Sequence, residues 1–294
     1  SASVSALAMA HRANTYLRAH FVDAASGGVF WQVDCQGKVT DGKKQAYAQA
    51  FAIYALTEYY LASQAADALR LACELQDMVE ARYWDAATGG YIEALDRNWQ
   101  PLADLRLSEK DLDAPKTMNT HLHVLEAYTL LHRVVDTDKT QQRLERTLSL
   151  FLERFVGADG HVRLFFDMDW TDRTRSVSFG HDIEASWLIW EAAEVLGDPG
   201  LCARARPAVL ALARTTLHEG LGEEGGLAYE RDETGHVDRD GEWWGQAEAL
   251  VGLVNAWQMT GDMAWIKAAE RVWRYTKAQY GAAGTSEWTW YPRN

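Results

Sequence analysis

Four segments of the sequence repeat one pattern, and this repetition most constrains the fold. Each segment opens on a glycine turn, continues through a short extended piece rich in aromatic residues, and ends in two helical stretches. The glycines that open the segments stand 62, 68 and 68 residues apart, at Gly27, Gly89, Gly157 and Gly225. A period of this length that holds two helices is typical of stacked helical hairpins.

The two helical stretches of each repeat differ in charge. The first is apolar apart from a few polar residues near its start, as in KQAYAQAFAIYAL from Lys44. The second carries Arg, Lys and Glu on one side, as in MAWIKAAERVWRYTKAQY from Met263. This difference predicts an inner ring of first helices surrounded by an outer ring of second helices. We therefore predict an all-α fold, an (α/α)6 barrel built as a toroid of helical hairpins.

The number of predicted helices falls short of a closed ring. One helix precedes Gly27 and four pairs follow, which makes nine, whereas six hairpins have twelve. We expect residues 1–294 to form a single (α/α)-barrel domain that lacks the first two helices and the last inner helix of the full ring. A five-hairpin solenoid that ends at its natural boundaries is the alternative.

Composition excludes several classes of partner. The formal net charge of −13 argues against binding to nucleic acid or to an anionic membrane, and favours a neutral or cationic small molecule. No run of 18 apolar residues occurs, and the first residues lack the pattern that predicts a signal peptide. Three cysteines, far apart in the chain, indicate a reducing compartment, so we expect a cytoplasmic protein. Oligomeric state cannot be predicted from the sequence.

Polar residues near the start of the apolar helices are the candidate site. Buried polar side chains are costly unless paired, and their recurrence in four repeats favours a shared site over isolated core hydrogen bonds. If these helices line a funnel, the following residues converge on it: Gln45, Tyr47, Gln49, Asn119, His121, His123, His181, Glu184, Trp243, Trp244, Gln246 and Glu248.

The two histidines of NTHLHVLEAY cannot both face the funnel, because they stand two positions apart in a helix. We favour His123, with Asn119 as its partner four residues earlier. His181 and Glu184, three apart, also share one helical face. A carboxylate beside an imidazole fixes its tautomer and raises its basicity, which suits proton abstraction.

Metal binding is a competing interpretation, since His-x-x-Glu pairs on facing helices build di-metal sites. The sequence has two such pairs, His123 with Glu126 and His181 with Glu184, but Gln, Tyr and Trp occupy the other inner helices. We therefore expect no metal. No P-loop, GxGxxG or GxSxG motif occurs, so we expect no nucleotide cofactor either.

Four motifs, KQAYAQAFAIYAL, KTMNTHLHVLEAYT, SFGHDIEASWL and EWWGQAEALVGLVNA, resemble the N-acylglucosamine 2-epimerase superfamily in order and spacing. Within it, they are most similar to the cellobiose 2-epimerase branch. The resemblance covers nearly the whole chain and implies an (α/α)6 barrel. It also implies cofactor-free inversion at C2 of a reducing sugar, such as the reducing-end glucose of cellobiose, through a cis-enediolate.

The resemblance also implies roles for individual residues. His181 matches one of the two acid/base histidines, Glu184 its neighbour, and His123 a histidine near the open-chain carbonyl. An arginine and the second acid/base histidine of the family would lie before Ser1 and beyond Asn294. Positions that match sugar contacts are Tyr47, Asn119, Trp244 and, in LAYER, Glu230.

Three other functions stay open. A mannose 2-epimerase or an aldose–ketose isomerase of the same superfamily would share the enediolate and differ in where the proton returns. A glycoside hydrolase would need two carboxylates that flank the glycosidic bond, for which Glu184 and Glu248 are candidates. An inactive sugar-binding fragment would bind cellobiose without turnover.

Overall fold

The computed structural model describes residues 2–281 and 287–292 and shows a chain built mainly from helices. The backbone divides into two compact units. The first comprises residues 1–147 and 165–173, and the second comprises residues 148–164 and 174–294. Each helical stretch predicted from the sequence is a helix within the described residues.

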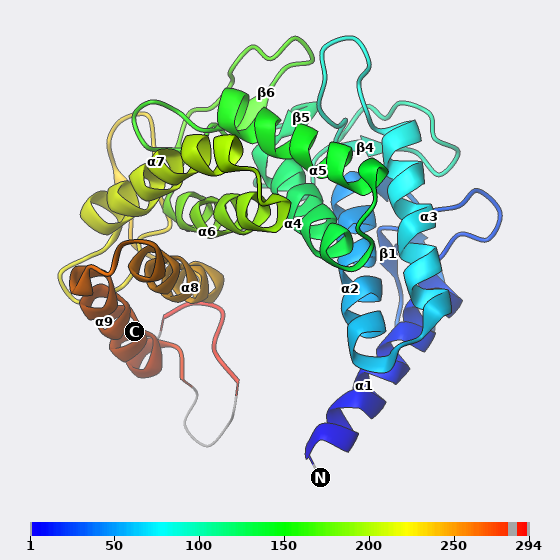
Figure 1. Cartoon of the computed structure of the whole chain (residues 1–294), viewed down its shortest axis with the longest axis horizontal. Helices are drawn as coiled ribbons and strands as arrows, with labels where there is room; N and C mark the ends of the chain where they lie inside the picture. Colours follow the sequence, from blue (N-terminus) through cyan, green and yellow to red (C-terminus); the bar gives the residue numbers. More distant parts are fainter. Residues whose placement is uncertain (1, 282–286, 293–294) are drawn as a thin grey trace. The chain divides into compact units, whose positions relative to one another are not determined.

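In the first unit, α2 (Ala46–Ser63) packs against three helices: α1 (Ala2–Tyr16), α3 (Ala66–Arg82) and α4 (Met118–Val134) (Figure 1). Because α2 and α4 have neighbours on several sides, they can bury apolar residues around much of their circumference. Most of α5 (Asp138–Leu150) also belongs to this unit, and a π-helical turn, η1 (Leu17–Phe21), extends α1.

In the second unit, α6 (Phe179–Leu196) packs against both α7 (Pro199–Thr215) and α8 (Trp243–Thr260), and α8 packs against α9 (Met263–Gln279) (Figure 1). The N-terminus of α7 is fixed by Asp198, whose carboxylate accepts the Leu201 N–H at 2.8 Å. Two π-helical turns, η2 (Phe151–Phe155) and η3 (Thr216–Gly220), belong to this unit as well.

Short antiparallel strands join one repeat to the next. β3 (Lys44–Gln45) pairs with β4 (Ala94–Leu95), and β5 (Lys116–Thr117) with β6 (Phe165–Phe166). In the second unit, β7 (Val177–Ser178) pairs with β8 (Glu230–Arg231). Because β3, β5 and β7 lead directly into α2, α4 and α6, this pairing fixes the backbone where each inner helix begins. The remaining pairs are β1 (Gln32–Val33) with β2 (Val39–Asp41), and β8 with β9 (Val237–Asp238).

None of the helices in the described part of the chain is both long and apolar enough to cross a membrane.

Candidate active site

One polar side chain near the start of each inner helix bonds the backbone of the extended piece before it. Gln49 donates to the Val29 carbonyl at 2.9 Å and accepts the Val29 N–H at 2.8 Å. Gln246 makes the same two bonds to Leu227, both at 2.8 Å. We call Gln49, Gln246 and the equivalent His121 and Asp182 the clamp residues.

At the equivalent positions of the other two repeats, an imidazole (His121) and a carboxylate (Asp182) take the place of glutamine. The Tyr91 N–H donates to His121 Nε2 at 2.8 Å, and the other ring nitrogen lies 2.6 Å from the Thr117 carbonyl. Burial lowers the pKa of His121 to about 3, which keeps the ring neutral. Asp182 accepts the Val162 N–H at 2.8 Å. Gln49, His121 and Gln246 each bond backbone groups of an extended piece, and this shared role accounts for their recurrence at one place in the repeats.

Asp182 also holds a buried histidine. Its second carboxylate oxygen lies 2.7 Å from His161 Nδ1, and His161 precedes the clamped Val162. Burial alone would lower the pKa of His161, but the hydrogen bond and the charge of Asp182 raise it above its ordinary value. A carboxylate is the clamp residue here because it can accept from the backbone and from the imidazole at once.

The predicted site residues of the inner helices stand one or two sequence positions from the clamp residues. Positions two before and two after a clamp residue are four apart and share one face of the helix. Inner-helix residues that we assigned to the site occupy the positions two before, one before or two after the clamp: Tyr47, Asn119, Trp244, His181, His123 and Glu184. At each helix start, the clamp residue bonds the backbone, whereas the predicted site residues stand one or two positions away from it.

In the first unit, His123 lies against an aromatic pair and a carboxylate. Its ring centre is 4.9 Å from that of Tyr47, edge to face, and 4.6 Å from that of Phe51. Its Nδ1 lies 2.9 Å from Glu126 Oε2. The partner at Nδ1 is therefore Glu126, where we had predicted Asn119. Half-buried Asn119 stands four residues earlier on the same helix. A carboxylate at Nδ1 fixes the proton there and makes Nε2 the acceptor nitrogen.

In the second unit, His181 is held by a hydroxyl group and an indole. Its Nδ1 lies 2.7 Å from Ser178 Oγ, and its ring centre is 5.0 Å from that of Trp244. The Trp244 Nε1–H donates to Glu242 Oε2 at 2.9 Å, which fixes the plane of the indole. The partner at Nδ1 is thus Ser178, and Glu184, the carboxylate that the sequence predicts to fix the tautomer, stands three residues after His181 on the same helix.

A glycine makes room for the indole beside His181. Gly180 stands two before its clamp residue, where the other repeats have Tyr47, Asn119 and Trp244. A Cβ atom at position 180 would lie 2.5 Å from the Trp244 ring. The absence of a side chain at Gly180 thus lets Trp244 pack over the start of α6.

Three carboxylates of the second unit are among the predicted residues. Glu184 is only 8% exposed and stands one helical turn after His181. Glu230, half-buried on β8, is the register partner of Ser178 on β7. The ladder thereby sets Glu230 beside the residue that holds His181. Glu248, a candidate for hydrolysis, accepts the Trp187 Nε1–H at 2.8 Å.

Sequence reasoning missed Ser178 and one buried carboxyl group, Glu93. Glu93 accepts hydroxyl hydrogen bonds from Thr117 at 2.7 Å and from Thr120 at 2.6 Å, at the N-terminus of α4. Burial raises its pKa to about 7. In GGYIEAL, Glu93 has the appearance of an exposed strand residue, and no local pattern marks it. For Ser178, a signal was present: a serine immediately before the helix, three residues ahead of a histidine.

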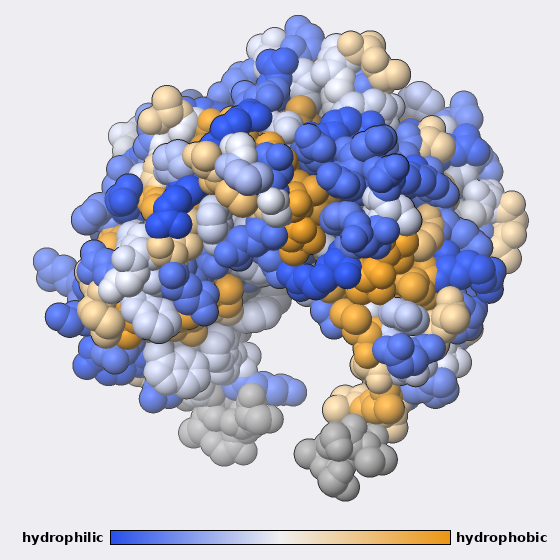
Figure 2. Space-filling view, in the orientation of Figure 1, coloured by the Kyte–Doolittle hydropathy of each residue, from blue (hydrophilic) through white to orange (hydrophobic). Residues whose placement is uncertain are grey.

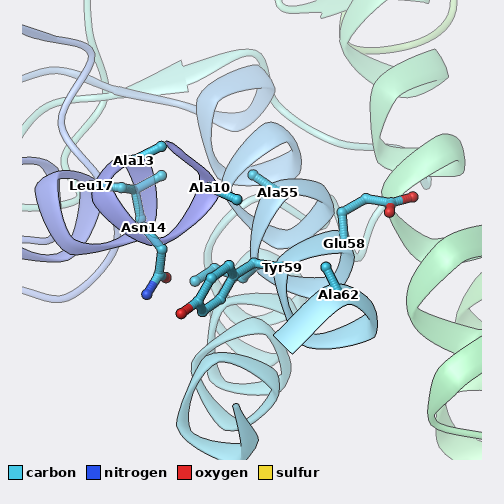
Figure 3. A pocket seen from close by; sticks show the side chains of 9 residues that line it. Ala10, Ala13, Asn14, Leu17, Ala55, Glu58, Tyr59 and Ala62 are labelled. Atoms are coloured by element: carbon cyan, nitrogen blue, oxygen red, sulfur yellow. The ribbon is translucent and has the colours of Figure 1, made fainter. Parts of the chain in front are cut away.

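An apolar cavity of the first unit lies away from these residues. It has a volume of about 420 Å³ and lies between α1 and α2, lined largely by alanine side chains with Asn14 and Tyr59 (Figure 3). The nearby surface of these helices is hydrophobic, with Leu7 and Leu61 exposed (Figure 2). None of the predicted site residues lines this cavity. Within the described ranges, no three His, Cys, Asp or Glu side chains group closely enough to hold a metal ion.

Comparisons with known proteins identify the family of the chain. A family model described as N-acylglucosamine 2-epimerase (GlcNAc 2-epimerase) matches residues 4–292. The chain belongs to the N-acylglucosamine 2-epimerase family. Among its relatives, a protein of Bacteroides fragilis named cellobiose 2-epimerase is 44% identical over 96% of this chain and 72% of its own length. Another of that name, from Ruminococcus albus, is 38% identical over 91% and 68%.

Solved structures of the epimerase family have the same fold. The structure of the cellobiose 2-epimerase from Bacillus thermoamylovorans B4167 matches with a TM-score of 0.90 at 37% identity, over 95% of this chain and 72% of that one. This similarity confirms the predicted all-α class of fold, the (α/α)6 barrel.

Proposed function

We propose that this chain is a carbohydrate 2-epimerase that converts the reducing-end glucose of cellobiose, or of a similar β-1,4-linked disaccharide, into mannose. Membership of the 2-epimerase family and the names of its relatives support the class of reaction and the sugar. The observation that carries the residue assignment is the place of His181, whose Nδ1 lies against Ser178 and whose ring lies against Trp244.

The reaction begins with the open-chain form of the sugar, in which the C1 aldehyde makes the C2 proton acidic. His181 removes this proton, and the electron pair of the broken C–H bond forms the C1–C2 double bond of a cis-enediolate. A proton delivered to the opposite face of C2 then restores the aldehyde with inverted configuration. An imidazole can take up and return a proton near neutral pH, which suits this transfer.

The other residues bind the sugar and stabilise charge. We assign His123 to the movement of a proton between O1 and O2, with Glu126 fixing its tautomer at 2.9 Å. Glu184 stands beside His181 on α6 and favours the imidazolium that forms on proton abstraction. Sugar contacts are assigned to Tyr47, Asn119, Trp244 and Glu230.

Incubation of the chain with cellobiose in D2O, followed by NMR, tests this function. We expect deuterium at C2 together with 4-O-glucosyl-mannose. Accumulation of glucosyl-fructose would identify an isomerase instead, and release of glucose would identify a hydrolase. Cellobiose that binds but keeps its C2 proton would contradict the assignment of an active epimerase.

The variant His181→Asn tests the role of the base. Asparagine keeps a polar side chain at the start of α6 but cannot accept a proton near neutral pH. We expect C2 exchange to fall below detection, while circular dichroism and the melting temperature stay close to those of the unmodified protein. Exchange that continues at a comparable rate would exclude His181 as the base.

A further inference from the structure

We propose that Ser178 is the positioning residue of His181: its hydroxyl oxygen accepts the Nδ1–H of the imidazole and so leaves Nε2 as the nitrogen that receives the substrate proton. This inference rests on the proposed function of His181. Neither the family match nor the sequence motifs assign any role to this serine.

The first observation is what the Ser178 hydroxyl does at the helix start. Ser178 is the N-cap residue of α6, where a serine oxygen ordinarily accepts a backbone N–H of the first turn. The Ser178 side chain makes no capping hydrogen bond to a backbone N–H within the described part of the chain. The equivalent N-cap residue of α4, Thr117, does accept the N–H of Thr120 at 3.2 Å. The oxygen of Ser178 is instead 2.7 Å from His181 Nδ1.

The second observation is that the backbone that carries this hydroxyl is fixed. Ser178 is 7% exposed and lies on β7, whose backbone pairs with β8 on one side. The next residue, Phe179, is fully buried in the core of the second unit. The backbone at position 178 cannot move far without breaking the ladder or the core, and the 2.7 Å contact with His181 sets the direction of the side chain.

The third observation is the contact on the face of the imidazole. Trp244 packs over Gly180 and against the His181 ring, and its own Nε1–H is bonded to Glu242. The indole restrains tilting of the ring, while Ser178 fixes rotation about the Cβ–Cγ bond. In the tautomer that we propose, the Nδ1–H donates to Ser178 Oγ, and Nε2 is the acceptor nitrogen.

The test compares Ser178→Ala, Ser178→Thr and the unmodified protein by long-range ¹H–¹⁵N NMR of the histidine rings. The His181 signals are identified by their loss in His181→Asn. We expect the unmodified protein and Ser178→Thr to carry the proton on Nδ1, and Ser178→Ala to show a mixture of tautomers. In the same samples, kcat for C2 exchange should fall about 10- to 100-fold in Ser178→Ala, with KM nearly unchanged, and recover in Ser178→Thr.

Asp198→Ala is the matched control, because it removes the cap of α7 in the same unit without touching His181. It should lower the melting temperature and leave the tautomer as it is. A proton on Nε2 in the unmodified protein, or an unchanged tautomer and kcat in Ser178→Ala, would overturn the proposal. If the unmodified protein showed no C2 exchange, the proposed function would fail, while the NMR comparison would still decide the role of Ser178.

Discussion

At the residue scale, Glu93 shows how burial can make one side chain sensitive to pH. Its carboxyl group is almost wholly buried, and burial raises its pKa from 4.5 to about 7. Below about pH 4.5 the group is protonated in both the folded and the unfolded chain. Between about pH 4.5 and 7 the unfolded chain releases the proton and the folded chain keeps it, so folding becomes less favourable as the pH rises.

We therefore predict that Glu93→Gln reduces the loss of stability over this range. Glutamine can accept from one threonine hydroxyl and donate to the other, and it does not ionise. Between about pH 5 and pH 8, the Glu93 carboxyl group should lower the free energy of unfolding of the unmodified protein by a few kcal/mol. The variant should not show this decrease. Urea unfolding at both pH values measures it. Equal pH dependence in the two proteins would contradict a buried neutral Glu93.

At the element scale, the clamp residues explain how four helices are fixed to four glycine turns. Each of these side chains satisfies backbone groups that would otherwise be buried without partners. Gln246 does so for both the N–H and the carbonyl of Leu227. Leucine has a similar size but bonds neither group, so the penalty of two unsatisfied backbone groups remains.

We predict that Gln246→Leu lowers the free energy of unfolding by about 3 kcal/mol. The matched control is Gln258→Leu, on the same helix α8 but at an exposed position, which should change stability by less than about 0.5 kcal/mol. Chemical denaturation of both variants provides the comparison. Similar losses in the two would mean that the substitution itself, and not the clamp, is responsible.

At the scale of the whole molecule, the formal net charge of −13 affects stability but not the binding of a neutral sugar. Repulsion among like charges opposes the compact state, and salt screens it over a Debye length of about 10 Å at 0.1 M. A disaccharide such as cellobiose carries no charge, so its binding has no long-range electrostatic component.

We expect the melting temperature to rise by roughly 3 °C between low salt and about 0.3 M NaCl, which corresponds to about 1 kcal/mol. The KM for cellobiose should stay within about twofold over the same range, because the substrate is neutral. Calorimetry and the NMR exchange assay measure the two quantities. A KM that rises steeply with salt would indicate a charged substrate and argue against cellobiose.

The sequence by itself determined the repeat, the class of fold and the family. These follow from local signals: glycine turns, apolar periodicity and the motifs that begin each inner helix. The same signals place His181, Glu184 and His123 on inner-helix starts, because positions along a helix are set by its 3.6-residue period.

Only the tertiary structure decided which polar residues hold the fold and which remain for chemistry. In the sequence, Gln49 and His121 cannot be distinguished in role from Tyr47 and His123. All four are polar or aromatic residues in the first turns of apolar helices. The partners of Gln49 and His121 are backbone groups about 20 to 30 residues earlier, and the hydrogen bond between them exists only once helix and strand are packed together. The pairing of His181 with Ser178 depends likewise on a backbone fixed by β8, more than fifty residues away in the chain.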